Sequence, residues 1–389
     1  MPRKPVTTSS WKSPLFTAAK LLTPLLLSSA CTSNTELEVD FSAFDAEVED
    51  ILAEHGLEGA SVAIVHRDAG QVHERAYGTW DVDRRSMLAS ASKILSAGVL
   101  AHLHDEGLVD LDAPISTYVS DWGQRAHDYN PSLAQLLSNS SGMPGLLDNP
   151  AYPPYLCMLS DRTTLGDCGQ SIYTASDAQV TVPPDTEYRY GGAQWQLAGA
   201  IAENVSGSLW STLVNDLYVE PCQLEGLAYG NPYGEYVEDL VESRSAAYPA
   251  DGFALEPSAN PNIEGGAYTA AGDYGQLLLM HLRGGECPGG RVLSEAMVER
   301  MQEDRILEWG GEASLGDLEY SLEGYGLGWW HDRDKPGLIA DPGVWSTTPW
   351  LDLPRGYGAI VQVEAGGEVA DVFLQRLVPL AGAAFDEAE

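Results

Sequence analysis

Positive charge is scarce in this sequence. Lys and Arg together number 21, against 57 Asp and Glu in 389 residues, so the formal net charge is −36. A surface of that sign repels phosphate backbones, which argues against nucleic acid as a partner. After residue 30 only two lysines remain, Lys93 and Lys335, and the first lies three residues after a serine.

Zinc-type cysteine clusters are also missing, because no Cys-x-x-Cys pair occurs. The one histidine pair at a metal-like spacing is His102 and His104, followed by Asp105. We interpret this segment as the polar end of a helix before Gly107, and we expect neither a metal nor an organic cofactor. The alternative, a metal hydrolase that uses His102 and His104, predicts sensitivity to chelators.

The N-terminal segment has the pattern of a targeting signal. Basic residues precede a short apolar stretch at 21–27, which is too short to span a bilayer, and small residues then lead to Cys31. We expect a signal peptide over 1–30 that resembles a bacterial lipoprotein signal, with Cys31 lipidated and attached to the membrane, and a polar tether over 31–40. Ser28 stands where such signals usually carry Leu, so ordinary secretion after cleavage near Ala30 is the alternative. The predicted location is the periplasm or the cell envelope.

Export makes the other four cysteines informative, because disulfides form in oxidising compartments. Four cysteines allow three pairings. We favour Cys157–Cys168 with Cys222–Cys287, since the first pair closes a short loop just after a proline-rich stretch.

The segment Ser90-Ala91-Ser92-Lys93 pairs a nucleophile with a base. On a helix, residues three apart are neighbours, whereas Ser92 points elsewhere. A serine hydroxyl needs a base to take its proton, and a lysine can be that base only where burial or positive charge keeps it neutral. The apolar run 94–101 that follows predicts a buried helix, so a lysine at its start favours a catalytic role.

Hydrophobic periodicity predicts helices and strands at both ends of the chain. Strands are expected over 60–67 and 71–77 as a hairpin, and over 325–331 and 356–364. Helices are expected over 41–54, from Ser90 onward, and over 193–205, 269–283, 294–303 and 368–377. Strands so far apart in sequence must pair in one sheet, which makes the middle of the chain an inserted or appended lobe.

Five stretches in order resemble the β-lactamase-related serine hydrolases, which comprise class C β-lactamases, D-alanyl-D-alanine carboxypeptidases and esterases. They are Ser90–Lys93, Glu106–Pro114, Gln135–Gly145, Pro184–Tyr190 and, after Gly265-Gly266, Gly324–Trp330. The resemblance implies an α/β (α+β) fold of the β-lactamase/transpeptidase type, with an antiparallel sheet flanked by helices and a mostly helical second lobe. The catalytic domain would cover 41–385, with an α/β lobe at about 41–107 and 262–385 and a helical, loop-rich lobe at about 108–261.

The resemblance also implies roles for individual residues. Ser90 would form an acyl-enzyme, with Lys93 and Tyr190 sharing the proton transfers. The backbone N–H of Ser90 would form half of the oxyanion hole. The best match to the family's Lys/His-Thr/Ser-Gly element is Asp341-Pro342-Gly343, which makes the N–H of Val344 the second donor.

Two departures from the family pattern concern substrate binding. Gly192 stands where the family often has Asn in Tyr-x-Asn, and Asp341 stands where β-lactamases have Lys or His. We expect Gly192, Asp341 and Gly343 to line the substrate site, with Asp341 repelling a substrate carboxylate.

These observations predict an exported serine hydrolase that cleaves a small ester, an amide or a peptide. One alternative is a true β-lactamase or a D,D-peptidase. The alternative from another class is a catalytically silent binding protein of the cell surface.

Overall fold

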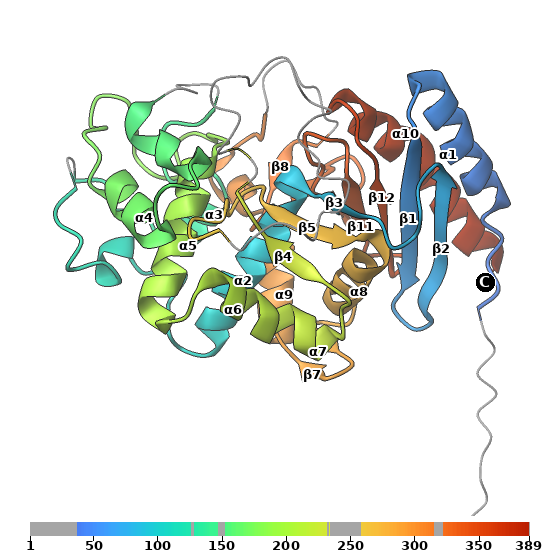
Figure 1. Ribbon diagram of the computed structural model, residues 1–389, viewed down its shortest axis with the longest axis horizontal. Coiled ribbons are helices and arrows are strands. Elements are labelled where there is room, and N and C mark those ends of the chain that lie inside the picture. The colour runs from blue at the N-terminus through green and yellow to red at the C-terminus, as the bar shows by residue number, and fades with distance from the viewer. Residues whose placement is uncertain are drawn as a thin grey trace, which may run out of the picture. The chain divides into compact units, whose positions relative to one another are not determined.

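Strands from both ends of the chain pair in one sheet, as predicted (Figure 1). The computed structural model describes residues 37–125, 128–146, 152–231, 233, 258–314 and 322–388. Its largest sheet is antiparallel, and the hairpin near residue 60 joins strands beyond residue 320 because β1 pairs with β12, Ala63 facing Ile360. In spatial order the seven strands are β2 (Gly70–Gly78), β1 (Gly59–His66), β12 (Tyr357–Gln362), β11 (Thr348–Asp352), β10 (Leu338–Ala340), β9 (Trp330–His331) and β8 (Gly324–Tyr325).

Helices cover both faces of this sheet. The helix α8 (Ala271–Leu282) contacts one face, where Gly275 lies close to Ala63 and Val65. On the other face α10 (Glu368–Ala388) stacks Phe385 on Tyr357. The N-terminal helix α1 (Ser42–His55) lies against α10, and Figure 1 shows this pair beside β1 and β2.

The middle of the chain is mostly helical and lies at the other end of the molecule, around α4 and α5 (Figure 1). Its α-helices are α3 (Leu133–Leu137), α4 (Leu165–Tyr173), α5 (Gly192–Ser206), α6 (Trp210–Val214) and α7 (Glu220–Cys222). Short 3₁₀ segments are η2 (Ile115–Thr117) and η3 (Pro153–Leu159), and a π-helical turn is η4 (Asn215–Val219). Among the described residues, no helix is both long enough and apolar enough to cross a membrane.

A small sheet and two short helices connect the two regions. In the three-stranded sheet, β5 (Ala267–Ala270) lies between β3 (Arg85–Met87) and β4 (Leu227–Tyr229). The helix α9 (Glu295–Met301) and the 3₁₀ segment η5 (Arg305–Trp309) follow a hairpin of β6 (Glu286–Cys287) and β7 (Gly290–Arg291).

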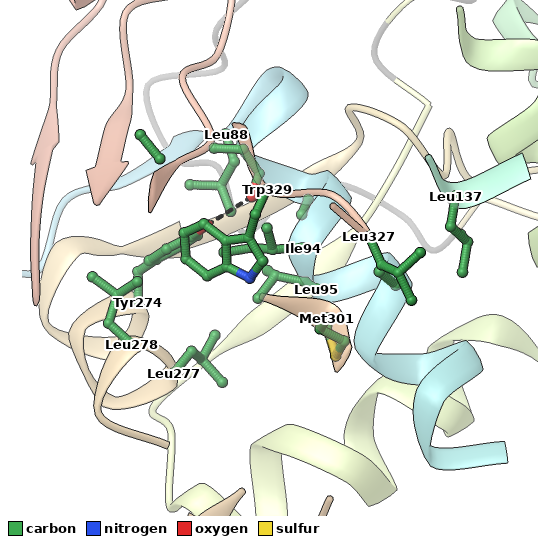
Figure 2. Packing of buried hydrophobic residues seen from close by; sticks show 14 of the residues in the cluster. Leu88, Ile94, Leu95, Leu137, Tyr274, Leu277, Leu278, Met301, Leu327 and Trp329 are labelled. Carbon is green, nitrogen blue, oxygen red and sulfur yellow. Dashed lines mark hydrogen bonds between the residues drawn. The ribbon is translucent and has the colours of Figure 1, made fainter. Parts of the chain in front are cut away.

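The helix predicted to begin at Ser90 is buried on nearly all sides. It starts as the 3₁₀ segment η1 (Ala89–Ser92) and continues as α2 (Lys93–Asp105). Ile94 and Leu95 belong to the same buried cluster as Trp329 and Leu278, and Figure 2 shows these side chains around the first turns of α2. An apolar surround of this kind holds the start of α2 in one position.

Two predicted elements differ from the observed ones. The segment 325–331 is not one strand but the two short strands β8 and β9, because Gly326 N donates to Trp329 O and Gly328 has φ +90°, which makes a tight turn. The closing helix continues past residue 377 and through Pro379. Its buried residues Leu377, Ala381 and Phe385 keep a four-residue spacing across the proline, so packing outweighs the helix-breaking tendency.

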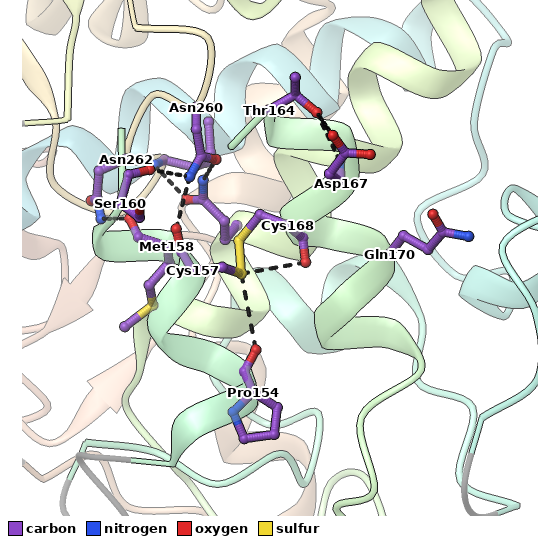
Figure 3. Close-up of a disulfide and its surroundings, with 12 residues drawn as sticks. Pro154, Cys157, Met158, Ser160, Thr164, Asp167, Cys168, Gln170, Asn260 and Asn262 are labelled. Carbon is purple, nitrogen blue, oxygen red and sulfur yellow. Dashed lines mark hydrogen bonds between the residues drawn. A yellow bond between two sulfur atoms is a disulfide. The ribbon is translucent and has the colours of Figure 1, made fainter. Parts of the chain in front are cut away.

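Both predicted cysteine pairs are at disulfide distance. Cys157 and Cys168 have Cα atoms 5.5 Å apart and join η3 to α4 (Figure 3). Cys222 and Cys287, with Cα atoms 4.7 Å apart, join α7 to β6. Cys31 and the predicted signal peptide lie outside the described residues.

Candidate active site

Ser90 and Lys93 meet at the start of α2. Lys93 Nζ donates to Ser90 Oγ at 3.2 Å, which is the contact expected from their spacing. Ser92 turns away, and its Oγ accepts a hydrogen bond from Ala267 N at 3.0 Å. The residue before Ser90, Ala89, has φ +47°, a left-handed conformation that a non-glycine residue adopts only when its surroundings enforce it.

Lys93 is fully buried among polar and aromatic groups from distant parts of the chain. Its Nζ donates to Glu264 O at 3.1 Å and lies 3.3 Å from Glu264 Oε2. It also lies 4.6 Å from the ring centroid of Tyr190. Burial disfavours the ammonium, but the negative charges that Tyr190, Glu264 and Asp341 carry when ionised outweigh that effect and raise the pKa of Lys93 above its usual value. The expectation that burial keeps Lys93 neutral therefore does not fit its surroundings.

Tyr190 lies just before α5 and faces Lys93. Burial raises the pKa of the Tyr190 phenol, and the opposing effect of Lys93 only partly offsets this rise. The ring contacts Trp330, with ring centroids 5.7 Å apart, and Tyr190 O accepts from Leu146 N at 2.7 Å. The pKa of each residue therefore depends on the charge of the other, and the carboxylate of Glu264 beside Nζ favours the ammonium form of Lys93.

Gly343 brings the segment after β10 against the residues that precede Ser90. A Cβ at this position would lie 2.3 Å from Leu88 O, so only glycine permits this approach. The next residue, Val344, is 47% exposed. Ser90 N precedes the first hydrogen bond of η1, Ala91 N to Leu88 O, as expected for a free N–H at a helix start. The structure thus brings together the two segments predicted to form the oxyanion hole.

Asp341 occupies a different position from the predicted one. Its side chain is fully buried, and Oδ2 accepts from Ile94 N at 3.4 Å, beneath the start of α2. Burial raises the pKa of this carboxyl well above its usual range, against the effects of Lys93 and of the backbone N–H groups of Ile94 and Lys93. A carboxyl in this place does not line the substrate site, so the expected repulsion of a substrate carboxylate by Asp341 loses its basis.

Glu264 was not predicted from the sequence. It contacts Lys93 through both its carbonyl and its carboxylate, and it faces Gly192 at the start of α5. Nothing marks it in the sequence except its place directly before Gly265-Gly266. His102 and His104 are not part of the site: His102 Nδ1 lies 2.9 Å from Val292 O, and Leu111 N donates to His104 Nδ1.

The site therefore combines a serine, a lysine that is hydrogen-bonded to its hydroxyl, a tyrosine whose ring contacts that lysine, and two backbone segments that lie close together. This arrangement, on an antiparallel sheet flanked by helices, defines a serine hydrolase. The family profile described as Beta-lactamase matches residues 44–382. The chain belongs to the Beta-lactamase family.

Relatives within this family have different activities. The chain is 24% identical to penicillin-binding protein 4 of Amycolatopsis lactamdurans, over 88% of this chain and 90% of that protein. It is 26% identical to the 6-aminohexanoate-dimer hydrolase of Paenarthrobacter ureafaciens, over 73% of this chain and 67% of the relative. A penicillin-binding protein homologue from Caulobacter crescentus has the same fold, with a TM-score of 0.65 at 19% identity over 88% of this chain and 97% of that one.

Proposed function

We propose that the protein is an exported serine hydrolase that cleaves an ester or an amide through an acyl-enzyme on Ser90. The observation that carries this proposal is the 3.2 Å contact between Lys93 Nζ and Ser90 Oγ in a buried, preorganised position. Ser90 Oγ attacks the carbonyl carbon, and the carbonyl oxygen becomes an oxyanion that the N–H groups of Ser90 and Val344 stabilise. Collapse expels the alcohol or amine, and water then hydrolyses the acyl-enzyme.

Tyr190 and Lys93 share the proton transfers in this scheme. The proton of Ser90 leaves toward Lys93, and the same pair returns a proton to the leaving group. Their mutual influence on pKa supports a shared role, because each residue shifts the ionisation of the other. Gly343 contributes by its missing side chain, which lets the oxyanion segment approach residues 88–90.

The two disulfides support export, because such pairs persist in oxidising compartments. We propose a periplasmic or cell-envelope location, with lipidation of Cys31 as the means of attachment. Globomycin treatment of expressing cells tests the lipidation, since it blocks processing of lipoprotein signals and would leave the full-length precursor in the membrane.

The relatives support hydrolysis of a small ester, amide or peptide without selecting among them. The penicillin-binding relative favours a second candidate, a β-lactamase or D,D-peptidase. Comparing kcat/KM for nitrocefin with that for p-nitrophenyl acetate separates the two. Higher efficiency on the ester supports an esterase or amidase, and higher efficiency on nitrocefin supports the second candidate.

A fluorophosphonate probe followed by peptide mapping tests the reaction class. We expect the label on the Ser90 peptide and full loss of labelling in Ser90→Ala, whereas Ser42→Ala, at an exposed serine of α1, keeps the label. Ser92→Ala is unsuitable as a control, because it leaves the buried Ala267 N without its acceptor. A silent binding protein takes no label, and wild-type turnover in Ser90→Ala would refute the assignment.

A further inference from the structure

The start of α5 lacks a side chain at the position nearest to the carboxylate of Glu264. A Cβ built on Gly192 would lie 1.8 Å from Glu264 Oε1 and 2.3 Å from Glu264 Cδ. These distances are far below any real contact, so a side chain at 192 and the present position of Glu264 exclude each other. The carboxylate fills the space that a side chain at 192 would occupy.

This carboxylate also makes the closest ionic contact of the catalytic lysine. Glu264 Oε2 is 3.3 Å from Lys93 Nζ, and the exposed fractions of the two side chains are 14% and 0%. The Coulomb attraction between the charges of such a buried ion pair is much stronger than that of a pair on the surface. Because Glu264 O also accepts from Nζ at 3.1 Å, one residue holds the ammonium from two directions while Nζ donates to Ser90 Oγ.

We propose that Glu264 is a positioning residue of this site, and that its carboxylate replaces the side chain missing at Gly192 and serves as the proton partner of Lys93. The inference rests on the proposed acyl-enzyme function. It explains how a charged Lys93 can still receive the Ser90 proton: Glu264 lies in direct contact with Nζ and can take one of its protons.

The proton balance of acylation follows from these contacts. As Ser90 Oγ bonds to the carbonyl carbon, its proton passes to Lys93 Nζ, and one Nζ proton passes to Glu264 Oε2. The carbonyl π electrons move to the oxyanion. On collapse, the bond to the leaving group breaks, the proton on Glu264 returns to Nζ, and Nζ gives a proton to the leaving oxygen or nitrogen. No proton or electron pair is gained or lost, and no further reactant is needed.

Other titratable groups face the same pair and must be considered in any pH profile. Tyr190 and Asp341 act on Lys93. The phenol of Tyr233 lies near Glu264, and burial raises its pKa far above its usual value, with Glu264 adding to the rise. Replacing Glu264 by glutamine keeps the shape of the side chain and removes its charge. The substitution therefore tests proton acceptance by Glu264 while the other titratable groups stay in place.

The first experiment is the pH dependence of kcat/KM for p-nitrophenyl acetate. In Glu264→Gln, only a deprotonated Lys93 can accept the Ser90 proton, so we expect the rising limb to move to higher pH and kcat at neutral pH to fall about 10²-fold with little change in KM. Glu203→Gln, at a partly buried acid that accepts from Trp210 N, is the matched control and should keep the wild-type profile. A Glu264→Gln profile that overlays the wild type would overturn the proposal.

The second experiment tests the shared space. Gly192→Asn alone should lower kcat/KM steeply, because its side chain meets the carboxylate. In the double variant with Glu264→Gly the space is free, so we expect at least tenfold more activity than the product of the two single losses predicts. Strict additivity in folded variants, verified by thermal melting, would contradict the inference. If the wild type itself neither labels with fluorophosphonate nor turns over an ester, the proposed function has failed instead.

Discussion

Replacing the buried carboxyl of Asp341 by an amide should stabilise the protein, and the gain should grow with pH. Burial raises the pKa of Asp341 well above its usual value, so the folded protein keeps a proton that the unfolded chain releases near about pH 4. The stability that this bound proton provides is fully present below the pKa of Asp341 in the unfolded chain. It is lost as pH rises toward the higher pKa of Asp341 in the folded protein. In that interval each pH unit costs about 1.4 kcal/mol of the free energy of unfolding.

Asp341→Asn does not titrate and nearly preserves the shape of the side chain. Its Oδ1 can accept the N–H of Ile94 that Asp341 Oδ2 now accepts. We therefore expect the free energy of unfolding of Asp341→Asn, minus that of the wild type, to be constant below about pH 4 and then to rise by about 1.4 kcal/mol per pH unit. Taking the difference cancels the titration of other groups that both proteins share.

Urea unfolding followed by tryptophan fluorescence, from about pH 4 to about pH 8, measures this difference. Asp185→Asn is an informative control with the opposite sign. Although burial acts to raise the pKa of Asp185, Arg305, Gln135 and Ser140 lower it below its usual value, so the charge stabilises the fold above the unfolded pKa of about 4. Asp185→Asn should therefore be less stable than the wild type by a nearly constant amount between about pH 4 and about pH 8. A pH-independent difference for Asp341→Asn, or a variant less stable than wild type throughout, would refute the reasoning.

Three further predictions follow from the site and the disulfides. Lys93→Ala should lower kcat by about 10²–10⁴ on p-nitrophenyl acetate, whereas Lys335→Ala, at an exposed lysine, should stay near wild type; equal losses would count against the catalytic role. Gly343→Ala should lower kcat about 10²-fold or more, because its Cβ displaces the proposed oxyanion segment, and Gly166→Ala, with open space at its Cβ, should not. Cys157→Ser should lower the free energy of unfolding by about 3 kcal/mol in oxidised protein, and an unchanged urea midpoint without reductant would argue against the bond.

The part of the site that could be predicted is the part that lies close together in sequence. Ser90 and Lys93 are three residues apart, so helix geometry alone brings them into contact. Tyr190, Gly343 and Val344 needed the family resemblance, because their approach depends on where α5 and β10 lie. Glu264 is 171 residues from Lys93, and the short loop that holds it has no periodic signal.

The fold was predictable where the pattern was long and regular. The hairpin of β1 and β2, the helix α5 and the pairing of strands from both ends follow from their periodicity. Strands of two or three residues, such as β8, β9 and β10, are too short to show alternation, and sheet contacts rather than local sequence define them. The prediction that the Asp341 side chain points into the substrate site was wrong for a similar reason. Neither Pro342 nor Gly343 indicates which side of the strand end faces α2.

The position of β12 in the sheet determines how early during synthesis the sheet can form. This strand lies between β1 and β11, so the sheet stays in two parts until residue 362 has left the ribosome. Ser90 is made early, whereas Val344, its proposed partner in the oxyanion hole, follows only after β10. A growing chain therefore has neither a joined sheet nor the proposed oxyanion hole until β12 and residue 344 have been made. That delay fits the proposed export of an unfolded polypeptide, and it confines hydrolysis to chains in which β12 has joined the two parts of the sheet.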